Sequence, residues 1–256
     1  MAQKKVCFAT LHGVLSFSDE GDNPVNMLEK QLKKISKIKP EIVYIEINSP
    51  GGTVAASEHI YNELMALREK GTEIIVLMQD FAASGGLMVS MAANRIFAYN
   101  GTLTGSIGVI MSHWALKDIA EKMGIGQTVI KAGEFKDVGN PFRDMTEEES
   151  VLLREIVTES HSDFIEIVAK GRDLSKETVN CFADGRVLTG RQALNYKLID
   201  NLGGRRAALD EIAKMVGVKV EKLNMIDVRS RPGLFSSFKK ILPWNKLGIY
   251  PSIELR

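Results

Sequence analysis

The stretch EIVYIEINSPGG at residues 41–52 decides the fold of this chain. Its first seven residues are rich in β-branched and aromatic side chains, which predicts a buried strand. The Ser-Pro-Gly-Gly sequence that follows permits only a tight turn, and a helix is expected from about Val54 to Lys70. Two glycines let this turn approach a ligand closely and let an N–H point outward where negative charge develops. We therefore predict Gly52 to be an oxyanion donor.

A second stretch of the same design follows about thirty residues later. The sequence EIIVLM at 73–78 predicts a strand, AASGG follows at 82–86, and the small apolar residues 85–93 suit a helix. Ser84 then lies at a strand-to-helix junction, where its hydroxyl is exposed as a nucleophile and the N–H of Gly85 is a second oxyanion donor. Ser84-Gly85-Gly86 alone could be an ordinary turn. Two such elements at the same end of neighbouring strands favour a serine hydrolase.

Composition restricts the class of protein. With 256 residues, 45% hydrophobic and 25% charged, the chain suits one sizeable globular domain. A net charge of +1 gives no reason to expect nucleic acid. Cys7 and Cys181 lie far apart, and no His, Cys, Asp or Glu group has metal-ligand spacing, so we expect neither a disulfide framework nor any metal or cofactor. The chain as given shows no transmembrane run and no signal-peptide core, so we expect it to be soluble.

Strands and helices are expected to alternate along the chain, which predicts a layered α/β fold. Thr146, followed by three glutamates, predicts the capped start of a long helix that runs to about Lys170. Shorter helices are expected after Ser175 and after Thr189-Gly190. The expected strands lie near 6–15, 41–48, 73–78 and 95–98, and the earlier helices near 25–38, 54–70, 85–93 and 115–123.

The sequence changes character near residue 226. We predict a main domain at 1–225 and a basic, aromatic C-terminal tail at 226–256, with Phe235 and Trp244 among its lysines. Such a tail suits an amphipathic segment on a membrane surface, and it equally suits a segment packed on its own domain or on a sister subunit.

A nucleophilic serine needs a base, and two candidates follow Ser84. His113 would give a Ser-His pair, the commonest arrangement. Lys136 lies in KAGEFKD at 131–137, followed by NPFRD at 140–144, an irregular loop of glycine, proline and mixed charges. The residues alone leave both candidates open. The default for His12, His59 and His161 is a packing or surface role.

Four motifs carry a family resemblance. Ser-Pro-Gly-Gly, Ala-Ser-Gly-Gly, LTGSIGV at 103–109 and Lys-x-Gly-x-Phe-Lys-Asp occur in the order and spacing of the signal peptide peptidase A family. The chain resembles a short, single-domain form of that family over roughly residues 5 to 215. ADGRV at 183–187 and TGRQA at 189–193 are similar to its late signature.

The resemblance implies a Ser-Lys dyad on a Clp-peptidase/crotonase-like layered fold with repeated ββα units and C-terminal helices. It implies Ser84 as the nucleophile, Lys136 as the general base, Gly52 and Gly85 as the oxyanion hole, and Ser106 as the residue that orients the lysine. It also implies a ring-shaped homo-oligomer with sites at subunit interfaces. The substrates would be released signal peptides and unfolded apolar segments, met near a bacterial cytoplasmic membrane.

Using lysine as a base has a physical requirement. A free lysine has a pKa near 10.4, and a lysine that accepts a proton from serine must be neutral, which requires an apolar environment. A carboxylate nearby would oppose this, so we expect Asp137 and Glu134 to face solvent or to pair with Arg143. Lys131 is the rival lysine, placed at the end of an expected strand at 127–130.

Two other functions remain open at this stage. One is a Clp-like peptidase in which His113 is the base and a partner ATPase delivers the substrate. The other is a non-hydrolytic crotonase-fold scaffold or acyl-thioester binder, in which the oxyanion hole merely holds a carbonyl.

Overall fold

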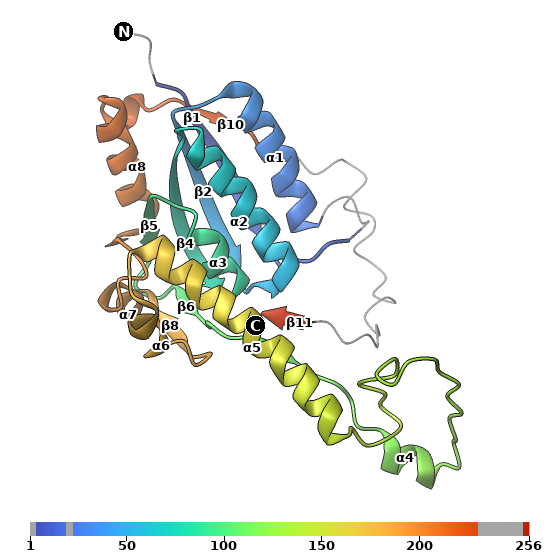
Figure 1. Ribbon diagram of the computed structural model, residues 1–256. Coiled ribbons are helices and arrows are strands. Elements are labelled where there is room, and N and C mark those ends of the chain that lie inside the picture. The colour runs from blue at the N-terminus through green and yellow to red at the C-terminus, as the bar shows by residue number, and fades with distance from the viewer. Residues whose placement is uncertain (1–3, 19–22, 230–252, 256) are drawn as a thin grey trace.

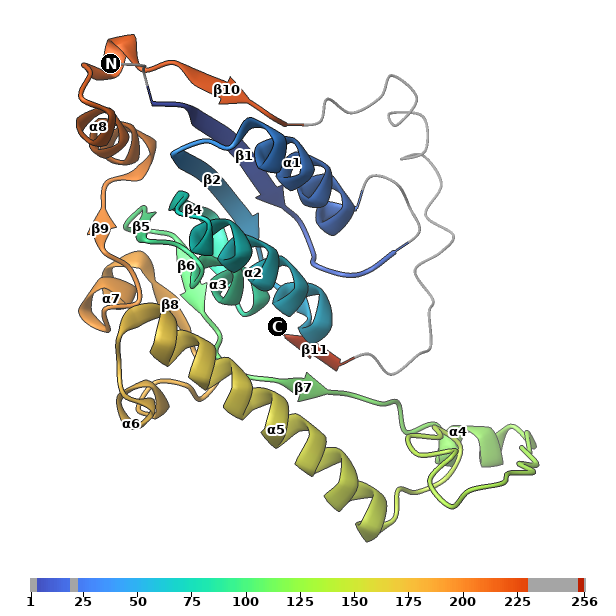
Figure 2. The same cartoon turned by 45° about the horizontal axis from the view of Figure 1, so that its top comes forward.

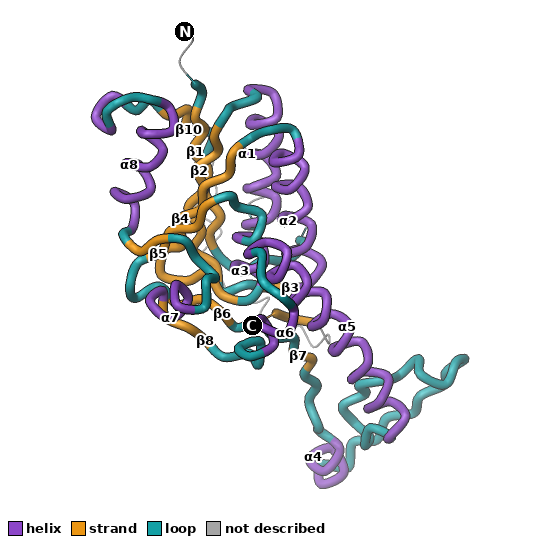
Figure 3. Tube along the Cα trace, turned by 60° about the vertical axis from the view of Figure 1, so that its left-hand side comes forward, coloured by secondary structure: helices purple, strands orange, loops and turns teal. Residues whose placement is uncertain are grey.

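The computed structural model describes residues 4–18, 23–229 and 253–255, the last three by their backbone alone. These residues form three layers. Helices α1 (Pro24–Ile38) and α2 (Val54–Glu69) cover one face of a mainly parallel sheet, and α8 (Gly204–Val216) covers the other (Figures 1 and 3). The predicted layered α/β fold with C-terminal helices is confirmed.

The main sheet has the strand order β10-β1-β2-β4-β5-β9. Its neighbouring strands are parallel, and both faces are buried, which explains the long apolar runs in the sequence. Beyond its pairing with β5, β4 pairs with β6, and β6 pairs antiparallel with β8. The strands are β1 (Val6–His12), β2 (Ile42–Ser49), β4 (Glu73–Ala83), β5 (Arg95–Ala98), β6 (Leu103–Gly105), β8 (Val187–Thr189), β9 (Asn201–Leu202) and β10 (Met225–Asp227).

The remaining helices are α3 (Gly85–Ser90), α4 (Lys117–Lys122), α5 (Glu147–Arg172), α6 (Lys176–Asn180) and α7 (Gly190–Asn195), with a 3₁₀ turn at Val220–Lys222. Helix α3 follows β4 directly, and α4 lies in a segment that extends away from the sheet (Figures 1 and 2). Only the C-terminal part of α5, from Phe164 onward, is buried against the core, while its N-terminal half projects outward. Among residues 4–18, 23–229 and 253–255, no helix combines the length and apolar character needed to cross a bilayer.

Residues 112–146, which we call the arm, precede this projecting half of α5. Figures 1 and 2 show that the arm, with α4 inside it, extends away from the sheet beyond the N-terminal end of α5. Residues 121–136 are all exposed. The strand expected at 127–130 was wrong, because these residues pair with no other described strand and Ile130 is 97% exposed. A β-branched run without a partner strand has no backbone bonds to hold it extended.

Other expected boundaries differ by a few residues. The first strand ends at His12 instead of residue 15, because Gly13 turns the chain with φ 102°. The third expected strand continues to Ala83, five residues further than predicted. Helices α3 and α4 are shorter than expected, at six residues each.

A small second sheet combines parts of the chain that are distant in sequence. The strand β11 (Ile253–Leu255) lies between β3 (Gly52–Thr53) and β7 (Ile110–Met111) and is antiparallel to both (Figure 2). This described part of the tail therefore packs on its own domain. The aromatic and basic residues of the tail, from 230 to 252, lie outside the described residues. Strand β10 pairs with β1 and continues across the boundary predicted at 225/226.

Candidate active site

Ser84 lies between the last residue of β4 and the first residue of α3. Its backbone has φ 53° and ψ −119°, a conformation that L-residues rarely adopt and that marks functional turns. Its N–H donates to the carbonyl of Gly105 at 2.9 Å, which fixes the turn to β6. The prediction of an exposed hydroxyl was wrong for the single chain, because the Ser84 side chain is fully buried at the junction of the sheet and α3. Its Oγ has no hydrogen-bond partner among the described residues. A buried hydroxyl without a hydrogen bond lowers the stability of the folded protein, and such groups occur at functional sites.

The Ser-Pro-Gly-Gly turn is held in place by Ser49. Ser49 Oγ donates to the carbonyl of Gly13 at 2.7 Å and accepts the N–H of Gly51 at 3.1 Å. Leu15 bonds to the carbonyl of Gly51 and to the N–H of residue 53, so the N–H of Gly52 points to the opposite side, where β11 lies. No side chain fits here, because a Cβ on Gly52 would lie 1.9 Å from the carbonyl oxygen of Leu15.

The two glycine elements are in contact, as the sequence predicted. Strands β2 and β4 are parallel neighbours, with Ser49 paired to Ala82. A Cβ on Gly85 would lie 2.1 Å from Ser57 Oγ and 3.3 Å from Gly51 Cα. This close approach brings the start of α3 against the Ser-Pro-Gly-Gly turn. The two predicted oxyanion donors and Ser84 therefore lie at one edge of the sheet.

Ser106 lies at the same edge. Strand β6 pairs with β4, with Gly105 opposite Ala83, so Ser106 follows directly beside Ser84. Ser106 is buried and has φ 52°, and its N–H donates to the carbonyl of Arg186 at 2.7 Å. Two adjacent residues with positive φ, Gly105 and Ser106, turn the chain sharply next to the nucleophile.

Lys136 is not brought to Ser84 within one chain. Lys136 is exposed in the arm, which Figures 1 and 2 show extending away from the sheet. The other candidate base is not close either. His113 is exposed in the loop after β7 and makes no hydrogen bond among the described residues. A single copy thus brings together the predicted nucleophile and the predicted oxyanion donors, while both candidate bases are exposed.

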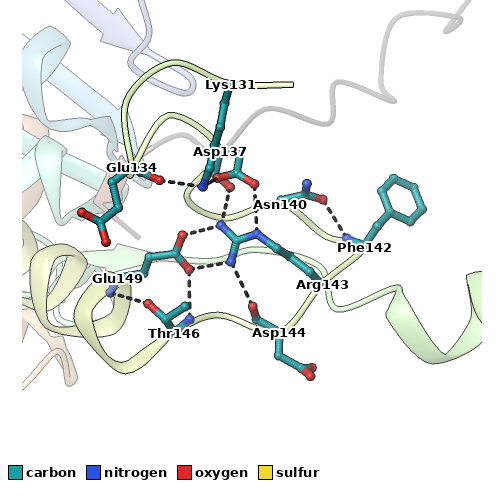
Figure 4. A network of polar contacts seen from close by, with 9 residues as sticks. All are labelled: Lys131, Glu134, Asp137, Asn140, Phe142, Arg143, Asp144, Thr146 and Glu149. Atoms are coloured by element: carbon teal, nitrogen blue, oxygen red, sulfur yellow. Dashed lines mark hydrogen bonds and ion pairs between the residues drawn. The ribbon is translucent and has the colours of Figure 1, made fainter. Parts of the chain in front are cut away.

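The loop that carries Lys136 is fixed by ion pairs (Figure 4). Arg143 Nε donates to Asp137 Oδ2 at 3.0 Å, which confirms the expected pairing, and Glu134 is exposed as the alternative allowed. The Nζ of the rival lysine, Lys131, forms an ion pair with Asp137 Oδ1 at 2.6 Å. Hydrogen bonds from Arg143 and then Lys131 hold the pKa of Asp137 well below its ordinary value.

The other end of this network is Glu149 in the first turn of α5. Both of its carboxylate oxygens accept from Arg143, and Oε2 also accepts the N–H of Thr146 at 2.9 Å. The hydrogen bonds from Arg143, with that from Thr146, lower the pKa of Glu149 to about 2. Glu149 is almost fully buried, which is unusual for a glutamate unless it is paired.

Several of these residues had no role in the sequence interpretation. Ser49 was part of a quoted motif, and a serine whose hydroxyl can accept the N–H two residues later is a known turn pattern. Ser57 gave no local signal, because its role is to lie beside Gly85 from another element. Glu149 was visible only as a capping residue of the long helix.

Comparison with known proteins agrees with this geometry. Residues 66–219 match Peptidase family S49, and residues 17–102 match Clp protease. This chain belongs to peptidase family S49. It is thus a member of a serine peptidase family, and the Clp protease match agrees with the Clp-peptidase-like layering of the sheet.

Individual relatives of the S49 chain extend over most of its length. A "Putative protease" of Synechocystis sp. is 38% identical over 196 residues, covering 77% of this chain and 70% of the relative. The "Putative signal peptide peptidase SppA" of Enterococcus faecium is 34% identical over 257 residues, covering 96% of this chain and 74% of the relative. The "Serine protease SPPA, chloroplastic" of Arabidopsis thaliana is 33% identical over 209 residues, covering 80% of this chain and 31% of the relative.

Proposed function

We propose that this S49 chain is a serine endopeptidase in which Ser84 is the nucleophile and Lys136 of a neighbouring copy is the general base. The observation that carries the proposal is the buried Oγ of Ser84, which has no hydrogen-bond partner among the described residues and lies on a strained turn at the edge of the sheet where the glycine turn also lies. The position of Ser84, Gly52 and Gly85 at one edge of the sheet supports these roles, and in this proposal the base comes from another copy because Lys136 is exposed in the arm.

The chemistry follows from this arrangement. Ser84 Oγ attacks the carbonyl carbon of the scissile peptide bond, and its proton passes to the neutral amine of Lys136. The N–H groups of Gly52 and Gly85 donate to the oxygen that becomes negative, and Ser106 orients the lysine. The C–N bond then breaks, the leaving amine takes the proton from the lysine, and water hydrolyses the acyl-serine ester in the reverse sequence.

A neighbouring copy would also supply the desolvation that a neutral lysine needs. The arm that carries Lys136 exposes an unusual amount of apolar surface in the single chain. Exposed single apolar residues are ordinary, but a concentration of them in one projecting segment marks an interface. The exposed apolar residues of the arm are Trp114, Ile119, Met123, Ile125, Val129, Ile130, Phe135 and Phe142.

The substrate is proposed to be an extended apolar peptide, such as a released signal peptide at a bacterial cytoplasmic membrane. Two observations support a peptide. One relative is named a signal peptide peptidase. In addition, β11 lies as an extended segment between β3 and β7, beside Gly52, so backbone groups at this edge are arranged for strand pairing.

The test is hydrolysis of a fluorogenic apolar peptide by the purified protein and by variants of it. Ser84→Ala and Lys136→Ala should each lose roughly three orders of magnitude of activity or more. Lys122→Ala, an exposed lysine of the same arm, is the matched control and should retain activity.

Mixing the two inactive variants tests whether the dyad forms between copies. Reassembly of Ser84→Ala with Lys136→Ala should restore part of the activity, because some interfaces would then join an intact Ser84 to an intact Lys136. If Lys136→Ala remains active while His113→Ala is inactive, the Ser-His alternative replaces the dyad. If Ser84→Ala also remains active, the hydrolytic proposal fails.

A further inference from the structure

Both sides of Lys136 are fastened to other parts of the arm, while its own side chain is not. Lys131 Nζ donates to the carbonyl of Glu134 at 2.7 Å, two residues before Lys136. Arg143 Nη2 donates to the carbonyl of Asp137 at 3.1 Å, one residue after it. The side chain of Lys136 makes no hydrogen bond or ion pair among the described residues. The loop thus holds the backbone of Lys136 firmly and leaves its amine free.

Arg143 is the residue that connects this loop to the rest of the molecule. Its Nε bonds to Asp137 and its Nη1 to Glu149 Oε2 at 2.8 Å, so one guanidinium joins the loop to α5 (Figure 4). The planar fork of arginine can hold two carboxylates in fixed directions, which a lysine cannot do. Nη1 also donates to the carbonyl of Asp144 at 3.0 Å, so the guanidinium fixes its own loop as well.

The far end of the connection is the capped first turn of α5. Glu149 is in the capping box of α5 with Thr146, and it is the one residue in the described N-terminal half of α5 that is buried. The next buried residue of α5 is Phe164, which lies about 22 Å further along the helix at 1.5 Å per residue. Within residues 4–18 and 23–229, the projecting half of α5 therefore has no buried apolar side chain near the arm. The orientation of the loop relative to α5 depends on the Asp137–Arg143–Glu149 contacts.

The same contacts determine which charges lie near Lys136. Asp137 is its chain neighbour, and a carboxylate close to a lysine favours the protonated ammonium, which cannot act as a base. Arg143 and Lys131 together occupy both oxygens of Asp137. These hydrogen bonds, first from Arg143 and then from Lys131, lower the pKa of Asp137, so its carboxylate stays ionised and paired.

We propose that Arg143 is a positioning residue for the proposed base: it fixes the Lys136 loop to the first turn of α5 and keeps the carboxylate of Asp137 away from the lysine. The proposal rests on the proposed role of Lys136. It assigns to Arg143 an effect on the rate of the chemical step, acting through Lys136 and not through the substrate.

The test compares Arg143→Gln with the parent protein in peptide hydrolysis. We expect kcat to fall roughly 10- to 100-fold while KM changes less than about twofold, because the base is displaced and the substrate edge is untouched. Arg143→Lys should give an intermediate value, since it keeps the charge and loses the fork. Arg154→Gln, an exposed arginine on the same helix without a described contact, is the matched control and should behave as the parent.

A second-site variant separates positioning from general damage to the fold. Adding Asp137→Asn to Arg143→Gln should restore kcat by about threefold or more, because the released carboxylate no longer holds the lysine protonated. A purely structural role for Arg143 predicts a further loss in the double variant instead. If Arg143→Gln does not assemble, Glu149→Gln is used, which keeps an acceptor for the cap of α5 and weakens only the contact with Arg143.

Two results would overturn the inference. One is a kcat within twofold of the parent for Arg143→Gln or Glu149→Gln in an intact assembly. The other is a double variant that is no more active than Arg143→Gln alone. Lys136→Ala is measured alongside: if it is inactive while the Arg143 variants are unaffected, only this inference fails, and if it is active, the proposed dyad itself fails.

Discussion

The buried hydroxyl of Ser84 predicts that removing this proposed nucleophile raises the unfolding free energy of the protein. An unpartnered buried polar group costs about 1–3 kcal/mol, and Ser84→Ala removes that cost without changing the backbone. The strained backbone at residue 84 lowers the unfolding free energy by about 1–3 kcal/mol more. This strain remains in Ser84→Ala and is relieved in Ser84→Gly. Ser84→Gly loses about 0.5–1 kcal/mol of this gain in unfolding free energy, because glycine makes the unfolded chain more flexible.

The expected order of unfolding free energy is therefore Ser84→Gly at least equal to Ser84→Ala, and both above the parent. A gain of about 1–2 kcal/mol for Ser84→Ala corresponds to a rise in Tm of about 2–8 °C at this chain length. Both variants should be inactive. The matched control is Ser90→Ala, because Ser90 is equally buried but donates to the carbonyl of Gly86 at 2.8 Å. Its loss should lower stability by about 1 kcal/mol.

The assay is urea and thermal unfolding followed by circular dichroism, at matched protein concentrations because assembly contributes to stability. The series is repeated in the Lys136→Ala background. There the hydroxyl has no lysine to bond in any copy, so the stabilisation by Ser84→Ala should be larger than in the parent. A Ser84→Ala variant that is destabilised by 1 kcal/mol or more in the Lys136→Ala background would refute the reasoning, since the hydroxyl would then have a protein partner.

Three other predictions concern separate parts of the molecule. Gly85→Ala should reduce peptide hydrolysis roughly 100- to 1,000-fold, because the added Cβ would lie 2.1 Å from Ser57 Oγ and must displace the backbone N–H that is proposed to be an oxyanion donor. Ser57→Ala in the same chain removes the clashing hydroxyl and should recover part of the activity; no recovery would contradict this. Because the pKa of Glu149 is lowered to about 2, its stabilisation of the arm is complete well above about pH 4.5 and is lost as the pH falls through that value towards 2. Protection factors for amide exchange in the arm, which correct for the intrinsic exchange rate, should therefore be equal at about pH 6 and about pH 7 and should fall below about pH 4.5; protection that stays constant down to about pH 3 would contradict this. Arg205→Ala should lower the unfolding free energy by about 2 kcal/mol in urea titrations, because the buried Glu46 loses bonds of 2.5 and 2.6 Å, and Glu46→Gln in the same chain should reverse part of the loss.

Local patterns in the sequence predicted the elements whose stability depends on near neighbours. The apolar strands 42–49 and 73–83 and the helices 24–38, 54–69 and 147–172 are bounded by turn and cap residues that act within a few positions. Short strands such as β6, β8 and β9 were not predicted. Two or three residues carry no detectable period, and these strands exist only because longer strands offer them partners.

The failure at residues 127–130 has the same origin. Val129 and Ile130 have high strand propensity, yet the arm offers them no partner strand among the described residues and they lie exposed. Strand propensity measures how well a residue fits into a sheet, but a strand forms only where a neighbouring strand is available for backbone hydrogen bonds.

The sequence by itself determined the serine and glycine motifs, the two glycine turns and the alternation of strands and helices, because each depends on residue types at fixed short spacing. Only the tertiary structure decided that Ser84 is buried with no hydrogen-bond partner for its Oγ in the described part of the chain, that Gly85 contacts the turn of Gly51, and that Lys136 is held in an arm away from the serine. These facts depend on distances between residues far apart in the chain, which are set by packing against the sheet and by the length of α5. The spacing of residues within a motif therefore does not predict these distances.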